Sequence, residues 1–281
     1  MYLYILSKLL SESLLSLYPI FVKYINISLE MKLWTRFISY LLISLVFINW
    51  SFISQNLFSL NGFLLGFITL LHVYFSYRGF ELLDSGVAYT LFYTYPMIIL
   101  LLSGNKLNYM FLLTLLGVFL LSKNQKIKEN FQQKMFSKNK YTQRFKYEGI
   151  IMILLASLTE AFIYFIVRNI KTLNNWNHLF LSYFLGGILL TFYFHKQIVN
   201  INIRNTLSVS MIINVIIGLV GYLLRFYATT RLNTKIYAYL SYFGIVMSYL
   251  YGIIINKEKL NITKIIGTLL IIFPNIWNIY K

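Results

Sequence analysis

Apolar segments of about twenty residues recur along almost the whole chain, and they limit its possible folds more than any other feature. A membrane span needs roughly 20 apolar residues, and backbone groups in lipid are satisfied only within helices or closed barrels. These segments are far longer than barrel strands and show no sustained alternation, so we expect helices. Ten are predicted, at about residues 3–24, 33–52, 60–78, 84–103, 107–121, 148–168, 176–195, 207–226, 234–255 and 262–279.

The composition agrees with a protein that lies almost entirely in a membrane. Hydrophobic residues make up 58% of the 281 residues and charged residues only 12%, against about 25% charged in soluble domains. We therefore expect neither a soluble enzyme nor a nucleic-acid-binding protein, despite the net charge of +17. The chain contains no cysteine, which excludes disulfides and cysteine–zinc sites. No metal or other cofactor is expected.

The second half of the chain repeats features of the first. The matching residues, at a constant offset of 150, are Tyr77 with Tyr227, Leu82 with Leu232, Ala88 with Ala238 and Tyr89 with Tyr239. Five helices are an odd number, so the second half enters from the opposite side of the membrane. We predict an all-α integral membrane protein of ten transmembrane helices in two inverted five-helix repeats. The repeats are residues 1–121 and 148–281, joined by a basic loop of residues 122–147.

Two passages resemble one family of membrane proteins. Residues 78–89, running on to Tyr95-Pro96, are similar to the third-to-fourth helix passage of the EamA-like drug/metabolite transporters. Residues 256–267 resemble the start of that family's last helix, and Arg36 matches an arginine common near the start of its second helix. The first half departs from the pattern at Asn105, where an acid is usual. The resemblance implies a ten-helix transporter with a central cavity beside the fourth and ninth helices.

Two carboxylates fall inside predicted helices, where ionisable groups are costly and hence candidate functional residues. Glu160 has no basic neighbour one turn away, whereas Lys8 precedes Glu12 by four residues, so those two could simply neutralise each other. The alternative for Glu160 is a hydrogen bond across helices. A carboxyl in a low-dielectric cavity can hold a proton or a cationic substrate. We predict that Glu160 and Glu12 bind substrate or protons, with Arg225 as the expected partner of Glu160.

Further candidates for the substrate- or proton-binding site lie on other helices. Arg225 is one, although an arginine near a helix end can also snorkel to the headgroups. His72 is titratable, but a lone histidine can be a packing residue. The aromatic candidates, which can line a cavity or simply pack helices together, are Tyr89, Tyr93, Tyr239 and Tyr242. No catalytic residue is expected.

The connecting segment, residues 122–147, carries eight lysines and arginines against one glutamate, interleaved with aromatic residues. This pattern predicts a segment that lies on anionic lipid headgroups. The positive-inside rule then places it in the cytoplasm and both termini outside. The family that the chain resembles usually has cytoplasmic termini instead. Without the lysines and arginines of this segment, the two sides of the membrane would carry nearly equal numbers of positive residues, so this segment alone decides the predicted orientation.

The expected function is secondary transport across the cell (inner) membrane. The chain would export small metabolites such as amino acids, amines or drugs by alternating access, with proton coupling, and the central glutamates favour cationic or zwitterionic cargo. The alternatives are a carrier of anionic metabolites such as nucleotide sugars, a non-transporting membrane subunit, or a lipid-modifying enzyme. Its partners would be a small-molecule substrate and the lipid bilayer, with no nucleic acid. A monomer or a homodimer is expected.

Overall fold

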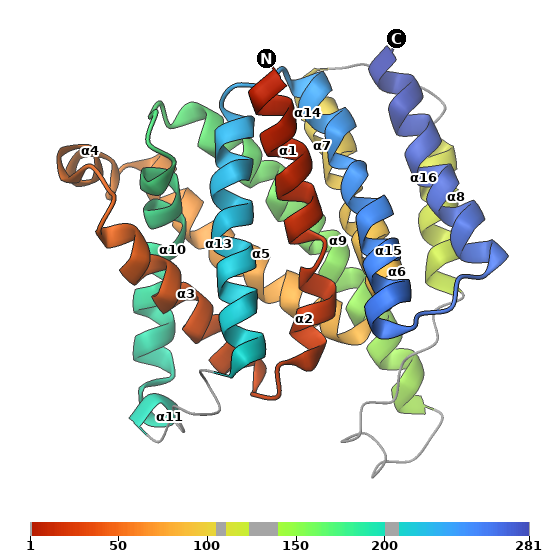
Figure 1. Ribbon diagram of the computed structural model, residues 1–281, viewed down its shortest axis with the longest axis horizontal. Helices are drawn as coiled ribbons and strands as arrows, with labels where there is room; N and C mark the ends of the chain where they lie inside the picture. The colour runs from red at the N-terminus through yellow and green to blue at the C-terminus, as the bar shows by residue number, and fades with distance from the viewer. Residues whose placement is uncertain (1, 105–110, 124–139, 200–207, 281) are drawn as a thin grey trace.

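The computed structural model describes residues 2–104, 111–123, 140–199 and 208–280 (Figure 1). Regular structure in these ranges is entirely α-helical, which confirms the predicted all-α class. The helices are α1 (Tyr2–Leu15), α2 (Tyr18–Tyr24), α3 (Leu29–Leu45), α4 (Trp50–Asn56), α5 (Leu60–Leu82), α6 (Ser85–Phe92), α7 (Tyr95–Leu102), α8 (Phe111–Lys123), α9 (Lys140–Asn169), α10 (Asn175–Tyr193), α11 (His195–Val199), α13 (Val209–Thr229), α14 (Thr234–Ser241), α15 (Phe243–Asn256) and α16 (Ile262–Tyr280).

Several helical segments are long and apolar enough to cross a membrane. The six that meet this criterion in the described ranges are Tyr2–Tyr24, Leu60–Leu82, Ser85–Leu102, Tyr147–Asn169, Val209–Thr229 and Thr234–Asn256. Two shorter apolar helices cover Leu112–Leu121 and Ile262–Pro274. These segments support an integral, multi-pass membrane protein. The count of ten spans and their inverted repeat stay predictions.

Large apolar side chains cover much of the helix surface, whereas several charged side chains lie inside the bundle. Large hydrophobic residues are exposed along several helices, among them Leu112, Phe119, Ile254 and Phe273. A soluble monomer rarely exposes wide apolar patches, so this surface fits contact with lipid. The interior is rich in tyrosine, and the tyrosines buried almost completely are Tyr40, Tyr77, Tyr89, Tyr93, Tyr95, Tyr183 and Tyr237.

Three of the apolar segments are interrupted near their middle. Two residues separate α1 from α2 and α6 from α7, and one residue separates α14 from α15. Pro19 and Pro96 occupy the first turns of α2 and α7, where a missing backbone N–H leaves no helical hydrogen bond unmade. Interrupted helices leave backbone groups and side chains in the interior of a membrane bundle, where they can bind ligands or ions.

Helices from the two halves of the chain alternate through the bundle (Figure 1). The closely packed pairs include α5 with α9 and with α10, α1 with α13, α3 with α10, α8 with α16, α6 with α15 and α7 with α14. The start of α1 and the end of α16 lie at the same edge of the molecule, and α2 lies toward the opposite edge (Figure 1). The interior is therefore built jointly by both halves.

Two boundaries differ from the prediction. The second predicted segment, residues 33–52, is in fact α3 and the separate short helix α4, because the Asn49 side chain accepts a hydrogen bond from Phe52 N and starts a new helix there. Helix α9 begins at Lys140, so the last part of the connecting segment is helical. Residues 124–139 of that segment lie outside the described residues, and its contact with lipid headgroups stays a prediction.

Candidate functional site

The two carboxylates singled out in the sequence meet at one arginine in the interior. Arg225 on α13 donates from Nη1 to Glu160 Oε1 on α9 at 2.6 Å. Its Nη2 also lies 3.2 Å from Glu12 Oε2 on α1. Arg225 is thus the partner of Glu160, as expected, and it joins Glu160 to Glu12 as well. All three side chains are at most 3% exposed.

Lys8 adds a second cation to this cluster. Its ammonium group forms an ion pair with Glu12 one turn along α1, which is the pairing considered from the sequence. The same nitrogen donates to Tyr95 Oη at 3.3 Å and lies 3.6 Å from the centre of the Tyr237 ring. Lys8 and Arg225 together balance Glu12 and Glu160. A buried charge is tolerated when it is paired in this way.

His72 on α5 completes the cluster. Its Nδ1 lies 3.1 Å from the carbonyl oxygen of Ala156, which only accepts, so Nδ1 carries a hydrogen. In a neutral ring Nε2 then has a lone pair, and it lies 3.3 Å from Glu160 Oε2. That carboxylate oxygen has no hydrogen-bond partner among the described residues. Two acceptors therefore face each other, and a proton between them would turn the contact into a hydrogen bond.

Small residues allow α1 and α13 to approach closely enough to form the cluster. Lys8, Ser11 and Glu12 lie on the buried face of α1, as their spacing of three and four residues predicts. Ser11 Oγ donates to the carbonyl oxygen of Gly221 on α13 at 2.8 Å. A Cβ at Gly221 would lie 2.7 Å from a methyl carbon of Leu15. An alanine at this position would therefore force the Leu15 side chain to shift.

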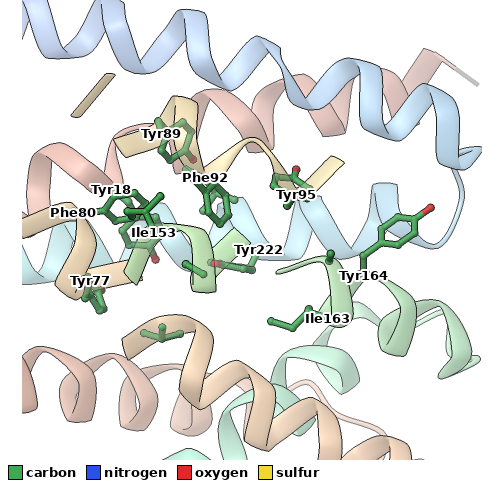
Figure 2. Packing of buried hydrophobic residues seen from close by; sticks show 14 of the residues in the cluster. Tyr18, Tyr77, Phe80, Tyr89, Phe92, Tyr95, Ile153, Ile163, Tyr164 and Tyr222 are labelled. Atoms are coloured by element: carbon green, nitrogen blue, oxygen red, sulfur yellow. The ribbon is translucent and has the colours of Figure 1, made fainter. Parts of the chain in front are cut away.

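A small cavity of about 20 Å³ lies beside the cluster, with room for about one water molecule. Its polar lining consists of Tyr18, Arg36, His72, Ser76, Tyr77, Tyr89, Tyr222 and Arg225. The apolar lining is formed by Leu15, Phe80 and Phe92. Figure 2 shows several of these rings, which come from α2, α5, α6 and α13. A metabolite could enter this space only after the surrounding helices move apart.

The predicted tyrosines do not all meet at this cavity. Tyr89 lines it, whereas Tyr93 and Tyr242 are buried with hydroxyls that have no partner among the described residues. Tyr239 is 41% exposed and does not line this cavity. The inward residues of α14 include Tyr237, and two residues turn a helix by about 200°, which points Tyr239 outward.

Arg36 is a buried residue of this site that the sequence indicated only through the family resemblance. It lies on α3, is 3% exposed, and donates from Nη2 and Nε to Tyr183 Oη at 2.8 and 3.2 Å. Four further tyrosine rings surround its guanidinium carbon, with their centres 4.7 to 5.4 Å away. A charge within an apolar helix is the general signal that could have marked it.

Ion pairs between the halves close the bundle at the end opposite to the chain termini. They are Lys23 with Glu258, Asp84 with Lys264, and Arg78 with Glu148. Glu258 Oε1 also accepts from Ser85 N at the start of α6, at 2.9 Å. Burial alone would raise the pKa of the Glu258 carboxyl, but Lys23 and the hydrogen bonds from Ser85 and Asn256 outweigh it and hold that pKa below its usual range.

The comparisons with known proteins agree with this architecture. The model of the EamA-like transporter family matches residues 147–275. The comparison with curated proteins gives no match. The matched range includes Glu160 and Arg225, and it corresponds to most of the second predicted repeat. Residues 147–275 of this multi-pass membrane protein are therefore similar to the EamA-like transporter family of the drug/metabolite transporter superfamily, the family that the sequence resemblance implied.

Proposed function

We propose that this protein is a secondary transporter of the cell (inner) membrane that exports small metabolites by alternating access with proton coupling. The observation that carries the proposal is the buried cluster of two carboxylates, two cations and one histidine. Both halves of the chain contribute to it, since Lys8, Glu12 and His72 come from the first half, and Glu160 and Arg225 from the second. Ionisable groups inside a membrane bundle mark substrate and proton pathways.

The packing of the helices supports ten spans in two inverted repeats, residues 1–121 and 148–281. If α1–α2, α6–α7 and α14–α15 are each one interrupted span, every half has five spans, and the fourth of each half is interrupted at an equivalent place. The second spans pack on each other, as do the fourth spans and the fifth spans. The first span of each half packs on the third span of the other. A two-fold relation between the halves would produce these pairs, whereas the packing of α5 on α10 is more extensive than that of its counterpart, α3 on α13.

The contacts of Arg225 suggest how protons and conformation are linked. Arg225 contacts Glu160 of its own half and Glu12 of the other half. A proton on either carboxyl weakens that contact, because a neutral carboxyl attracts the guanidinium less. The contact between His72 Nε2 and Glu160 Oε2 offers a place for the proton. Protonation at this point would loosen the link between the halves.

The closing ion pairs supply the second part of an alternating-access cycle. Lys23–Glu258, Asp84–Lys264 and Arg78–Glu148 each join one half to the other at the same end of the bundle. Opening the cavity toward that end requires these pairs to separate. In the structure they are formed, and the cavity holds no more than about one water. The arrangement corresponds to closure on that side.

Transport in proteoliposomes tests the proposal. The purified protein is reconstituted with a pH-sensitive dye inside, a pH gradient is imposed, and amino acids, amines, cationic drugs and small carboxylates are added in turn. We expect at least one class to move protons faster than in protein-free liposomes. If no compound is moved, transport is refuted. Lipid products found by mass spectrometry of the same vesicles would instead favour the lipid-modifying enzyme.

A further inference from the structure

We infer that the cavity holds the anionic end of its cargo, a carboxylate, at Arg36. This inference rests on the proposed transport function and narrows its substrate class. It differs from the expectation drawn from the glutamates, which favoured a cationic or zwitterionic cargo. The reason is that Glu12 and Glu160 are already occupied by cations of the protein itself, whereas Arg36 is not matched by an acid.

Arg36 stands apart from the other buried cations. Lys8 and Arg225 pair with Glu12 and Glu160, and Lys32 lies 2.5 Å from Glu81. Arg36 has no acidic partner within ion-pair distance in the described part of the chain. Since Lys8, Glu12, Glu160 and Arg225 sum to zero, the interior keeps one uncompensated positive charge.

Tyrosine rings compensate this charge in part. The Tyr18 ring centre lies 4.7 Å from the guanidinium carbon, and that of Tyr222 lies 5.2 Å from it. Aromatic faces attract a cation, but they do not supply the counter-charge that a buried ion ordinarily has. The Nε and Nη2 groups of Arg36 both point at one hydroxyl, Tyr183 Oη. The two parallel N–H groups on this edge match a carboxylate, which could replace the hydroxyl.

The charged residues that line the cavity are positive, like the uncompensated charge of Arg36. They are Arg36 and Arg225, and no carboxylate borders the cavity. Unused donors lie in the same region: Arg225 Nε and Asn214 Nδ2 have no partner among the described residues. Both side chains are at most 3% exposed, and Asn214 Oδ1 is held by Tyr77 Oη at 2.6 Å. An ammonium group would meet two guanidinium groups here, whereas a carboxylate would meet donors.

The residues that line the cavity also indicate the chemistry of the rest of the ligand. One uncompensated charge matches a monoanion better than a phosphate dianion. Phe80, Phe92 and the ring of Tyr89 form an aromatic wall of the cavity that the two arginines also line. These rings, gathered in Figure 2, suit an apolar or aromatic body attached to the carboxylate. The cargo class is therefore a small apolar monocarboxylate.

The test compares three ligands that share one body and differ in charge: 3-phenylpropionate, 3-phenylpropanol and 3-phenylpropylamine. Binding to the full-length protein in detergent is measured by titration calorimetry. We expect the carboxylate to bind at least tenfold more tightly than the alcohol, and the amine most weakly. Equal binding of all three, tighter binding of the amine, or no binding of any would overturn the inference. So would tighter binding of 3-phenylpropyl phosphate.

Variants assign the binding to Arg36. Arg36→Gln should remove the preference for the carboxylate, and Arg36→Lys, which keeps the charge but loses the planar fork, should weaken carboxylate binding about tenfold. The matched control is Arg168→Gln, a cation outside the cavity that contacts Tyr164; it should bind like the parent. If Arg36→Gln does not fold, the lysine variant and the ligand series on the parent decide. An unchanged preference in a folded Arg36→Gln protein would refute the site.

The same ligands separate this inference from the proposed transport. Carboxylate binding that depends on Arg36, without movement of the carboxylate in proteoliposomes, would support the site and refute transport. Transport of amines that is unaffected by Arg36→Gln would refute the site and leave transport standing.

Discussion

Replacing Glu160 by glutamine removes one negative charge from a cluster that is balanced in the structure. The amide keeps the size of the side chain, but Arg225 loses its 2.6 Å ion pair and retains only Glu12, at 3.2 Å. Breaking one partner of a buried pair costs about 3–5 kcal/mol. Because Glu12 remains, we expect the lower end, about 3 kcal/mol. This corresponds to a fall in Tm of roughly 6–12 °C on the scaling of domains of 150–250 residues.

The second variant in this experiment, Glu160→Gln with Lys8→Met, restores the balance of charge. Lys8→Met alone leaves one excess negative charge and should also cost about 3 kcal/mol. In the double variant Glu12 no longer pairs with Lys8 and can form an ion pair with Arg225 alone. The two losses therefore should not add. Instead of about 6 kcal/mol, we expect the double variant to lose about 3 kcal/mol, a coupling of about 3 kcal/mol.

Thermal unfolding in detergent, followed by circular dichroism for the parent, both single variants and the double, measures the cycle. The double variant should unfold close to either single variant. Losses that add to within about 0.5 kcal/mol would show that Lys8 and Glu160 act independently and would refute the balanced cluster. In proteoliposomes, proton-driven transport should be lost in both variants that lack Glu160. Normal pH-dependent transport by a folded Glu160→Gln protein would rule out its coupling role.

Three further predictions concern other parts of the molecule. Folding lowers the pKa of the Glu258 carboxyl. Its stabilising effect is therefore present at pH values above the ordinary pKa near 4.5 and is lost as the pH falls through the lowered pKa. Glu258→Gln should consequently reduce the fall in Tm at acid pH. Gly218→Ala places a Cβ against the Tyr18 hydroxyl, and the overpacking should cost about 1–3 kcal/mol in thermal unfolding. In this cysteine-free chain, Ser137→Cys, outside the described residues, should resist an impermeant thiol reagent on intact cells, whereas Leu173→Cys should react; the reverse pattern would invert the orientation.

Much of the fold could be predicted because lipid enforces simple rules. Long apolar runs must be helices, and a carboxylate in the middle of such a run needs a partner, which led to Glu160 and Arg225. The interruptions between α1 and α2 and between α14 and α15 were not predicted. Pro19 marks the first in the sequence, but the second has no proline, and its position depends on packing against other helices.

The surroundings of Arg36 could not be predicted, for a related reason. Its hydrogen-bond partner Tyr183 lies on α10, 147 residues away, and the other rings come from α2, α3, α5 and α13. No spacing along the chain shows that five tyrosines meet at one point. The outward position of Tyr239 has the same origin, since the break after α14 fixes which residues of that helix face inward.

The two charge systems of the interior predict how protons and cargo depend on each other. With Glu12 and Glu160 ionised, the cluster of Lys8, Glu12, Glu160 and Arg225 is neutral, and Arg36 leaves a net charge of one. A proton on Glu160 alone raises the net charge to two, whereas a carboxylate at Arg36 lowers it to zero. A proton added after the carboxylate meets less repulsion than one added before it. Proton and carboxylate should therefore favour each other's binding, and by linkage equally.

We consequently expect a monocarboxylate and a proton to cross together, so that the transport step moves no net charge. In proteoliposomes with valinomycin and a potassium gradient, the initial rate of 3-phenylpropionate flux should not change with membrane potential, while an imposed pH gradient should accelerate it toward the alkaline side. Export would then be driven by the cargo's own concentration gradient, because an inward proton gradient opposes it. A rate that rises steeply with membrane potential and ignores the pH gradient would show that the anion moves alone. That result would show that carboxylate binding at Arg36 does not depend on proton binding at Glu160, and it would refute their coupling.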